Sequence, residues 1–352
     1  MRALTVIPSQ KGSLQVTDVP EPEPGPGDLL VDGMAVGVCG TDREIAEGLY
    51  GSAPPGQRRL VIGHESLGRV RAAPDGSGFQ AGDLVVGVVR RPDPEPCLAC
   101  AHGEFDMCRN DGYTERGIKG IDGYASQRWV VDPDYAVRLA PELAEVGMLM
   151  EPTTIVAKAW DQIEKVGARS AFEPRSVLVT GAGSIGLLAA LLGVQRGLDV
   201  HVLGRAGGGP KPALLADLGA TYHCDGLEEV ARRVRPDIVI EATAAEEIIV
   251  GVMTITSPYG IVCLLGVSTP GATIPADMGA VNRKIVLEND VVIGSVNANL
   301  RHYRLAADAL ARADVAWLSR LVSRRVPLED FAEAFAYRPG DVKVVIELDG
   351  TG

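Results

Sequence analysis

The sequence predicts an α/β protein with two domains, one rich in β-strands and one built on a doubly wound parallel sheet. Up to residue 150, short Val, Leu and Ile stretches are separated by Gly, Pro and Asp, which is typical of strands joined by turns. From residue 176 onward, apolar strands alternate with helical stretches, as in a parallel sheet covered by helices. The 352 residues suffice for two domains of ordinary size.

The composition is that of an ordinary globular protein. Apolar residues make up 46% of the chain and charged residues 23%. No apolar run approaches the ~18 residues that a membrane span needs, and the opening apolar run is too short for a signal peptide. A formal net charge of −12 without a basic tract disfavours nucleic acid as a partner. We therefore expect a cytoplasmic protein that binds neither membranes nor nucleic acid.

The predicted secondary structure changes at Glu151 from short strands to helices, which marks the expected domain boundary. Residues 151–168 are predicted to form a helix with Pro152 in its first turn. The last fifty residues mix strand-like and helical segments and end in an apolar strand, so we expect them to complete the first domain. The predicted β-rich domain covers residues 1–152 and 298–352, and the predicted parallel-sheet domain covers residues 153–297.

A glycine-rich turn follows the first strand of the parallel-sheet domain. In "SVLVTGAGSIGLLAALLG", Gly181, Gly183 and Gly186 form a G-x-G-x-x-G pattern between a strand and a helix. The first glycine makes the tight turn, the second lets the backbone approach a pyrophosphate, and the third lets helix and strand pack closely. The helix N-terminus offers free N–H groups to the phosphates. The pattern predicts a dinucleotide site; the alternative is a glycine-rich turn in an unrelated α/β domain.

The next strand indicates which dinucleotide is bound. A site for NAD usually places Asp or Glu about 20 residues after the glycines. Here the strand ends in Gly204 and Arg205, and no carboxylate occurs between His201 and Asp217. A guanidinium can pair with a 2′-phosphate, which a carboxylate would repel. We predict that NADP is preferred and that NAD is possible; the alternative is that Arg205 stacks on the adenine.

Three segments of the chain contribute residues that can bind zinc. Cys39 follows an apolar stretch, His64 and Glu65 occur in "VIGHESLGRV", and Glu151 lies at the domain boundary. Taken singly, each is also compatible with a core or surface position. Catalytic zinc takes three protein ligands of these types and keeps one position open. Together, in glycine-bracketed turns ahead of a nucleotide domain, they predict a catalytic zinc site.

A second cluster of cysteines lies in "RRPDPEPCLACAHGEFDMC". Cys97, Cys100 and Cys108 form a C-x₂-C-x₇-C run, and clustered cysteines in a reducing compartment indicate a metal. Structural zinc normally has four ligands, so the fourth is uncertain here. The two scattered cysteines, Cys224 and Cys263, are predicted to be core residues.

The segments "GVCGTDREIAEGLYG", "LVIGHESLGRV", "MLMEP", "GAGSIG", "NDVVIGSVNAN" and "RPGDVKVVIEL" resemble the zinc-dependent medium-chain dehydrogenases. More narrowly, they are similar to the glucose 1-dehydrogenase branch known from archaea. The resemblance runs nearly end to end, in order and spacing. It implies a GroES-like catalytic domain and a Rossmann domain, with the active site in the cleft between them. It also implies a homodimer or homotetramer.

The resemblance implies a role for each candidate residue of the catalytic site. The implied ligands of the catalytic zinc are Cys39, His64, Glu65 and Glu151. Of the two glutamates, one would bind directly and the other through water or by exchange. Thr41 matches a hydroxyl that bonds the reacting oxygen, and Asp42 matches a carboxylate that orients the imidazole of His64. Glu44 stands where some relatives use a proton-passing histidine, so the proton's exit route stays open.

The resemblance also bears on the cysteine cluster. The family's structural zinc lobe has a fourth cysteine where this chain has Pro94. The candidates for a replacement ligand are Asp93, Glu95 and His102. We expect a bound structural zinc; the alternative is a loop that holds no metal.

Four residues are expected to contact the substrate: Thr41, Glu115, Glu151 and Asn297. Glu115 matches an acidic residue that contacts sugar hydroxyls, and Asn297 matches a polar group near both the nicotinamide and the sugar. Sugars need several directed hydrogen bonds because their hydroxyls must be satisfied again on leaving water. Glu115 could instead be a surface carboxylate, and His302 is predicted to lie on a helix face without contacting substrate.

The expected function is therefore zinc-dependent transfer of a hydride from C1 of a glucose-like aldose to NADP, giving a lactone. One alternative is an NAD(P)-dependent dehydrogenase of another polyol, an aminocyclitol or a secondary alcohol, because the shape of the pocket decides among these. An alternative of another class is a non-catalytic relative that binds NADP as a sensor or structural protein. Such a relative would be expected to lack zinc ligands, and Cys39, His64 and Glu151 are all present.

Overall fold

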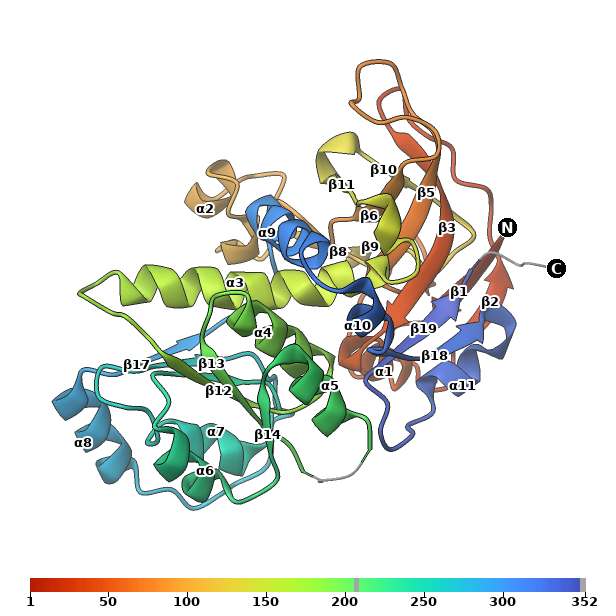
Figure 1. The fold of residues 1–352 in the computed structure, drawn as a ribbon. Coiled ribbons are helices and arrows are strands. Elements are labelled where there is room, and N and C mark those ends of the chain that lie inside the picture. The colour runs from red at the N-terminus through yellow and green to blue at the C-terminus, as the bar shows by residue number, and fades with distance from the viewer. Residues whose placement is uncertain (206–208, 349–352) are drawn as a thin grey trace. The chain divides into compact units, whose positions relative to one another are not determined.

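The computed structural model describes residues 1–205 and 209–348, which form two compact units (Figure 1). The first unit comprises Met1–Thr154 and Asn297–Gly352, and the second comprises Ile155–Val296. In the described residues, no helix combines the length and the apolar character needed to cross a membrane.

The first unit is dominated by β-sheets. Its strands are β1 (Arg2–Val6), β2 (Gln15–Asp18), β3 (Leu29–Val38), β4 (Leu60–Val61), β5 (Glu65–Ala72), β6 (Leu84–Gly87), β7 (Arg90–Arg91), β8 (Thr114–Arg116), β9 (Gly120–Ile121), β10 (Arg128–Val131), β11 (Ala136–Arg138), β18 (Val322–Pro327) and β19 (Lys343–Glu347). The largest sheet has the order β11-β6-β5-β3-β19-β18, with β10 also paired to β3, and two smaller sheets have the orders β2-β1-β4 and β7-β8-β9. Its α-helices are α1 (Gly40–Ala46), α2 (Leu98–Ala101), α9 (Leu300–Ala311), α10 (Val315–Ser319) and α11 (Phe331–Phe335).

Strand β3 lies at the centre of the large sheet. It is paired antiparallel with β5 on one side and with β19, from the end of the chain, on the other. Its buried Val36 packs in one core cluster with Ile62 and Ile346. The tail is therefore an integral part of this sheet, and both neighbours of β3 carry residues of the candidate site.

The second unit contains a six-stranded parallel sheet. Its strands are β12 (Ser176–Thr180), β13 (Asp199–Leu203), β14 (Thr221–His223), β15 (Ile238–Glu241), β16 (Ile261–Leu264) and β17 (Val291–Gly294). Its helices are α4 (Ser184–Val194), α5 (Lys211–Leu218), α6 (Leu227–Val234), α7 (Glu246–Val252) and α8 (Met278–Glu288), and α3 (Met150–Gly167) leads into it. The order β14-β13-β12-β15-β16-β17 reverses at β12, and helices cover both faces (Figure 1). The predicted doubly wound sheet is confirmed.

The glycine pattern lies at the carboxyl end of β12, where the strand order reverses. Gly181 has a φ of +99°, which favours glycine, and Gly183 begins α4. A β-carbon at Gly186 would overlap the carbonyl oxygen of Gly181, so only glycine allows α4 to pack this closely on the turn. By contrast, a β-carbon at Gly183 would meet no atom within 4 Å. The open space beside Gly183 is where a ligand can approach the backbone.

These contacts predict opposite results for two similar substitutions. Gly186→Ala should lower the free energy of unfolding by about 1–3 kcal/mol, because the added methyl overpacks the turn. Gly183→Ala should leave the unfolding midpoint unchanged and weaken dinucleotide binding. Urea unfolding and cofactor titration of both variants measure the two effects. Equal stability of the two variants would contradict this account of Gly186.

Candidate active site

Cys39 is placed by the junction between β3 and α1. Strand β3 ends at Val38, and Cys39 is the residue that caps the start of α1. Its backbone N–H donates to Asp42 Oδ2 at 2.9 Å, which satisfies a donor that the helix leaves without a partner. Asp42 is buried. The local sequence Cys-Gly-Thr-Asp thus builds a helix start that holds the thiol in one position.

His64 faces the thiol from the residue before β5. Its Nε2 lies 3.0 Å from Cys39 Sγ, and its Nδ1 lies 3.3 Å from Asp42 Oδ1. Burial raises the pKa of the Cys39 thiol, although His64 opposes this shift. Burial would lower the pKa of His64, but Cys39 and Asp42 raise it well above its ordinary value. Asp42 therefore stands against the imidazole as expected from sequence.

Glu65 is buried beside the same pair and is held by a lysine. Ligand atoms of Cys39, His64 and Glu65 all lie within 4.8 Å of one another. Both carboxylate oxygens of Glu65 accept hydrogen bonds from Lys343 Nζ, at 2.5 and 2.7 Å, in a fully buried ion pair. Gly37 is opposite Glu65 on β3, and a β-carbon there would overlap the Glu65 carboxylate.

Lys343 was missed by the sequence analysis. It is the first residue of β19 and is separated from Glu65 by 278 residues. From the sequence, a lysine at the start of a strand is expected to be exposed to solvent. The one available signal was its place in "DVKVVIEL", inside a strand with too few polar neighbours to be a surface strand.

Glu151 and Thr41 lie near this cluster without joining it. The carboxylate of Glu151 is outside the group of atoms within 4.8 Å, although His64 and Glu65 act on it electrostatically. Burial raises the pKa of Glu151 to about 7. Thr41 is partly buried on α1, and in the described part of the chain its hydroxyl has no hydrogen-bond partner. That hydroxyl is available to a ligand.

The donor set of this cluster fits zinc. A thiol, an imidazole and a carboxylate are all preferred zinc ligands, and Asp42 occupies the other nitrogen of His64, as in carboxylate–histidine–zinc arrangements. The site is also acidic, with Asp42, Glu65 and Glu151 around it and Lys343 as the counter-charge. A buried cluster of this charge favours a divalent cation.

The cysteine cluster of residues 97–108 is assembled as predicted. Sγ atoms of Cys97, Cys100 and Cys108 lie within 4.8 Å of one another. Backbone N–H groups of Cys100 and Arg109 lower the pKa of Cys97 to about 7, while burial raises that of Cys100 to about 11. Among the described residues, no fourth His, Cys, Asp or Glu atom joins this group. Asp93 instead accepts a hydrogen bond from the backbone N–H of Glu95, at 2.9 Å.

The structure brings two of the predicted substrate residues together. Asn297 Nδ2 donates to Glu115 Oε1, and Glu115 is buried, so it is not the surface carboxylate of the alternative interpretation. Glu115 also accepts two hydrogen bonds from Arg90, a residue that the sequence analysis missed. His302 lies on α9 as expected but is fully buried, with its Nδ1 accepting from the N–H of Asn299.

The end of β13 carries the residues predicted to select the dinucleotide. Gly204 donates its N–H to the His223 carbonyl at 2.9 Å, and a β-carbon there would overlap the Tyr222 ring. Arg205 follows and is exposed. Its guanidinium can therefore reach a ligand from the solvent side. Cys263 is buried in β16 as predicted, whereas Cys224 is exposed just past the end of β14, so its predicted core position is wrong.

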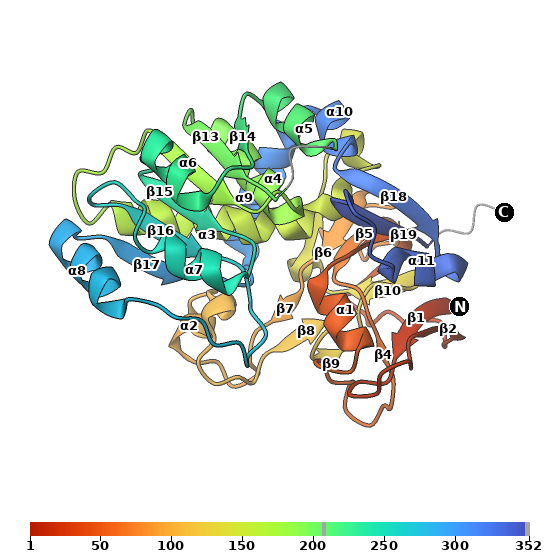
Figure 2. The same cartoon turned by 90° about the horizontal axis from the view of Figure 1, so that it is seen from below.

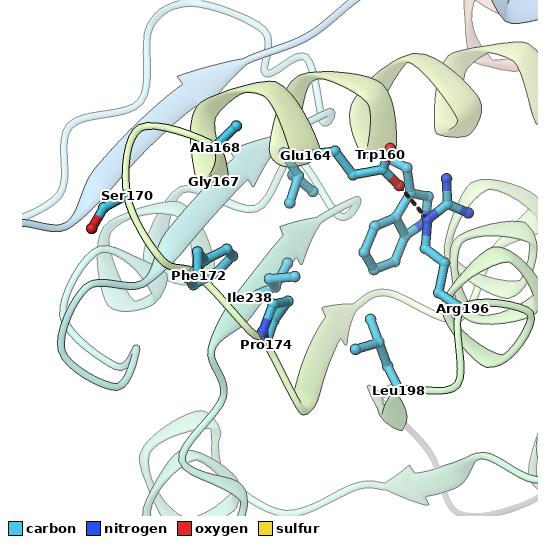
Figure 3. Close-up of a pocket in the computed structure, with 11 residues that line it drawn as sticks. Trp160, Glu164, Gly167, Ala168, Ser170, Phe172, Pro174, Arg196, Leu198 and Ile238 are labelled. Atoms are coloured by element: carbon cyan, nitrogen blue, oxygen red, sulfur yellow. Dashed lines mark hydrogen bonds and ion pairs between the residues drawn. The ribbon is translucent and has the colours of Figure 1, made fainter.

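A cavity of about 410 Å³ lies elsewhere in the second unit (Figure 3). Its lining includes Pro174 before β12, Leu198 before β13 and Ile238 at the start of β15. It therefore opens at the amino ends of the parallel strands, whereas the glycine turn follows a carboxyl end. Parallel sheets of this type bind ligands at the carboxyl edge, so this cavity is not the dinucleotide site.

Comparison with known proteins identifies the class. Residues 25–141 match the family model for the alcohol dehydrogenase GroES-like domain, and residues 144–348 match that for the glucose dehydrogenase C-terminus. The fold and the cysteine–histidine–glutamate cluster are thus those of an oxidoreductase of the alcohol dehydrogenase class. Within that class, the chain belongs to the glucose 1-dehydrogenase family of zinc-dependent medium-chain dehydrogenases. The predicted resemblance is confirmed.

Individual relatives match over the full length. Glucose 1-dehydrogenase of Methanocella arvoryzae is 39% identical, with 99% of each chain covered, and that of Thermoproteus tenax is 38% identical with the same coverage. Among solved structures, Haloferax mediterranei glucose dehydrogenase in complex with NADP, Zn and gluconolactone matches with a TM-score of 0.91 and 32% identity, covering 100% of both chains.

The pKa shifts predict how zinc affinity depends on pH. Zinc requires a deprotonated Cys39 and a neutral His64, and both groups keep their protons to a higher pH than usual. Metal-free protein should therefore bind zinc about ten- to a hundredfold more tightly for each unit of pH between about 6 and about 8. Competition with a chromophoric chelator measures this. Cys39→Ser should lose the part of the pH dependence that comes from the thiol and keep the part that comes from His64, whose pKa Asp42 also raises. Affinity that is flat across this range would contradict the assignment.

Proposed function

We propose that this protein oxidises C1 of a glucose-like aldose with NADP as hydride acceptor and zinc as the catalytic metal, giving a lactone. The observation that carries the proposal is the convergence of Cys39, His64 and Glu65, with Asp42 behind the imidazole. The sequence-wide match to glucose 1-dehydrogenases supports the substrate class.

The chain offers four residues for the catalytic metal. Cys39 and His64 would bind it directly. Because Lys343 holds both oxygens of Glu65, we assign the direct acidic ligand to Glu151 and an outer or exchanging role to Glu65. Zinc at this site supplies a Lewis acid that makes an alcohol hydroxyl easier to deprotonate, a far larger effect than a side-chain base alone provides.

The surrounding residues orient the substrate and the ligands. Asp42 holds the imidazole of His64 so that Nε2 faces the thiol. The Thr41 hydroxyl has no protein partner in the described chain and is available to hydrogen-bond the reacting oxygen and relay its proton. Glu115 and Asn297 are joined by a hydrogen bond and offer polar groups for other sugar hydroxyls.

The second unit is proposed to hold NADP, which supplies the hydride acceptor. The turn of Gly181, Gly183 and Gly186 presents the N-terminus of α4 to the pyrophosphate. Arg205 is exposed after Gly204 and has no neighbouring carboxylate on its strand end. This arrangement suits a 2′-phosphate, so we propose that NADP is preferred over NAD.

We also propose a second, structural zinc at Cys97, Cys100 and Cys108. Three thiols in contact are a strong zinc-binding set, with water or a nearby oxygen as the fourth ligand. Free thiols such as these persist in a reducing compartment, which supports a cytoplasmic location.

A homodimer or homotetramer is proposed for the assembled enzyme. Strand β17 ends the parallel sheet, and the same unit exposes large apolar side chains. These are Val267, Met278, Val286, Leu287 and Val296, each more than half exposed. Apolar patches and free strand edges of this kind are normally covered by a partner, here a second copy of the chain.

The proposed activity predicts a metal-dependent aldose oxidation. Purified protein should reduce NADP with glucose or a related aldose and form the lactone, detected by NMR. Chelation should lower the rate by about 100-fold or more, and added zinc should restore it. Turnover that is unaffected by metal removal would overturn the mechanism. Preference for a polyol, aminocyclitol or secondary alcohol would correct the substrate, and NADP binding without any turnover would indicate a non-catalytic relative.

The assignment of Arg205 predicts a change in cofactor preference. Arg205→Ala should reduce the ratio of kcat/KM for NADP to that for NAD by about 10- to 100-fold, because a charge-assisted pair with the 2′-phosphate is lost. Arg283→Ala, which removes an exposed arginine from α8, serves as the control and should keep the ratio. An unchanged ratio in Arg205→Ala would remove the assignment.

A further inference from the structure

The carboxylate of Glu115 is bonded unevenly. Glu115 on β8 is directly opposite Arg90 on β7. Its Oε1 accepts from Arg90 Nε at 3.1 Å, from Arg90 Nη2 at 3.0 Å and from Asn297 Nδ2. Within the described chain, Oε2 has no hydrogen-bond partner. It is also not fully enclosed by protein atoms. One oxygen is saturated, and the other is open to a ligand.

Arg90 has no freedom to leave this position. It is buried, its Nη1 donates to the Asp106 carbonyl at 3.1 Å, and its guanidinium carbon lies 3.7 Å from the centre of the Tyr113 ring. Lys119 Nζ lies 4.0 Å from the centre of the same ring and is itself held by Asp111 at 2.7 Å. The cation–π contacts of Tyr113 with Arg90 and Lys119 therefore hold all three side chains in place.

The Arg90–Glu115 pair lies beside the proposed metal site in the same unit. Gly117, two residues after Glu115, packs its backbone directly on that of Gly63, the residue before His64. Ser52, which follows α1, donates its N–H to the Ile118 carbonyl at 2.9 Å. Figure 2 shows β8 and β9 next to α1. The turn that carries Glu115 therefore packs on both segments that supply Cys39 and His64.

The bonding pattern limits what the open oxygen can bind. Arg90 is buried, and three of its five N–H donors are used by Glu115 and the Asp106 carbonyl, so its charge is directed at Glu115 and not at a ligand. A bare carboxylate oxygen accepts hydrogen bonds and repels phosphates and carboxylates. Its ligand is a hydroxyl donor on an uncharged molecule.

From this geometry we propose that Arg90 is a positioning residue, which holds Glu115 so that Oε2 accepts one hydroxyl of a neutral sugar. This inference rests on the proposed function and adds the determinant of hydroxyl selectivity. Arg90 acts through Glu115 and does not itself touch the sugar. The site thereby selects an unmodified hydroxyl and rejects phosphorylated or acidic sugars at that position.

Kinetics with monodeoxy sugars test the proposal. The wild-type enzyme should lose about 10- to 100-fold in kcat/KM with the one deoxyglucose that lacks the recognised hydroxyl. Arg90→Lys keeps the charge and loses the planar fork. It should raise KM for glucose about tenfold, leave kcat and the KM for NADP nearly unchanged, and bring the glucose-to-deoxyglucose ratio close to one.

Two further variants separate positioning from folding. Arg91→Lys alters the next residue of β7, whose guanidinium donates to the Val88 carbonyl and not to Glu115, and it should preserve the ratio. Tyr113→Leu removes the ring under Arg90 and should lower the ratio partially, so it tests the proposal if Arg90→Lys does not fold. An Arg90 variant that loses activity equally on every sugar, with the ratio intact, would overturn it.

The outcomes distinguish this inference from the proposed function. If the wild-type enzyme oxidises no aldose, the proposed function fails, and calorimetric binding of glucose and its deoxy analogues then tests Arg90 alone. Selective binding that Arg90→Lys abolishes would uphold the positioning role. Absence of sugar binding, or equal binding of all analogues by the wild-type protein, would overturn it.

Discussion

The carboxylate of Asp42 is the constraint on which the site depends. One oxygen accepts the N–H of Cys39 and starts α1, while the other lies 3.3 Å from Nδ1 of His64. A single buried side chain therefore caps the start of the helix and also makes an ion-pair contact with the imidazole. Because the two segments share this anchor, the thiol and Nε2 meet at 3.0 Å although 25 residues separate them.

Around that anchor, charge is balanced by residues from the far end of the chain. Glu65 is buried, and its charge is tolerable because Lys343 donates to both of its oxygens. The ion pair in turn needs Gly37, since any side chain there would overlap the carboxylate. The pairing of β19 with β3 thus sets the electrostatics of the proposed metal site as well as completing the sheet.

A buried carboxylate paired with a cation also occurs among the proposed substrate residues. Glu115 and Glu65 are both buried carboxylates paired with a cation, but they differ in how many of their oxygens are hydrogen-bonded. Lys343 engages both oxygens of Glu65, whereas Arg90 and Asn297 converge on one oxygen of Glu115. The first arrangement supplies charge to the site, and the second leaves an acceptor for a ligand.

From the sequence alone we could predict the parallel-sheet domain, the glycine turn and the residue types of the proposed zinc site, because these depend on local spacing and on backbone geometry within a few residues. Only the folded structure shows that Lys343 faces Glu65, that Arg90 faces Glu115 and that Cys224 is exposed. Such pairings depend on which strands become neighbours and in which register, and no pattern confined to one segment encodes them.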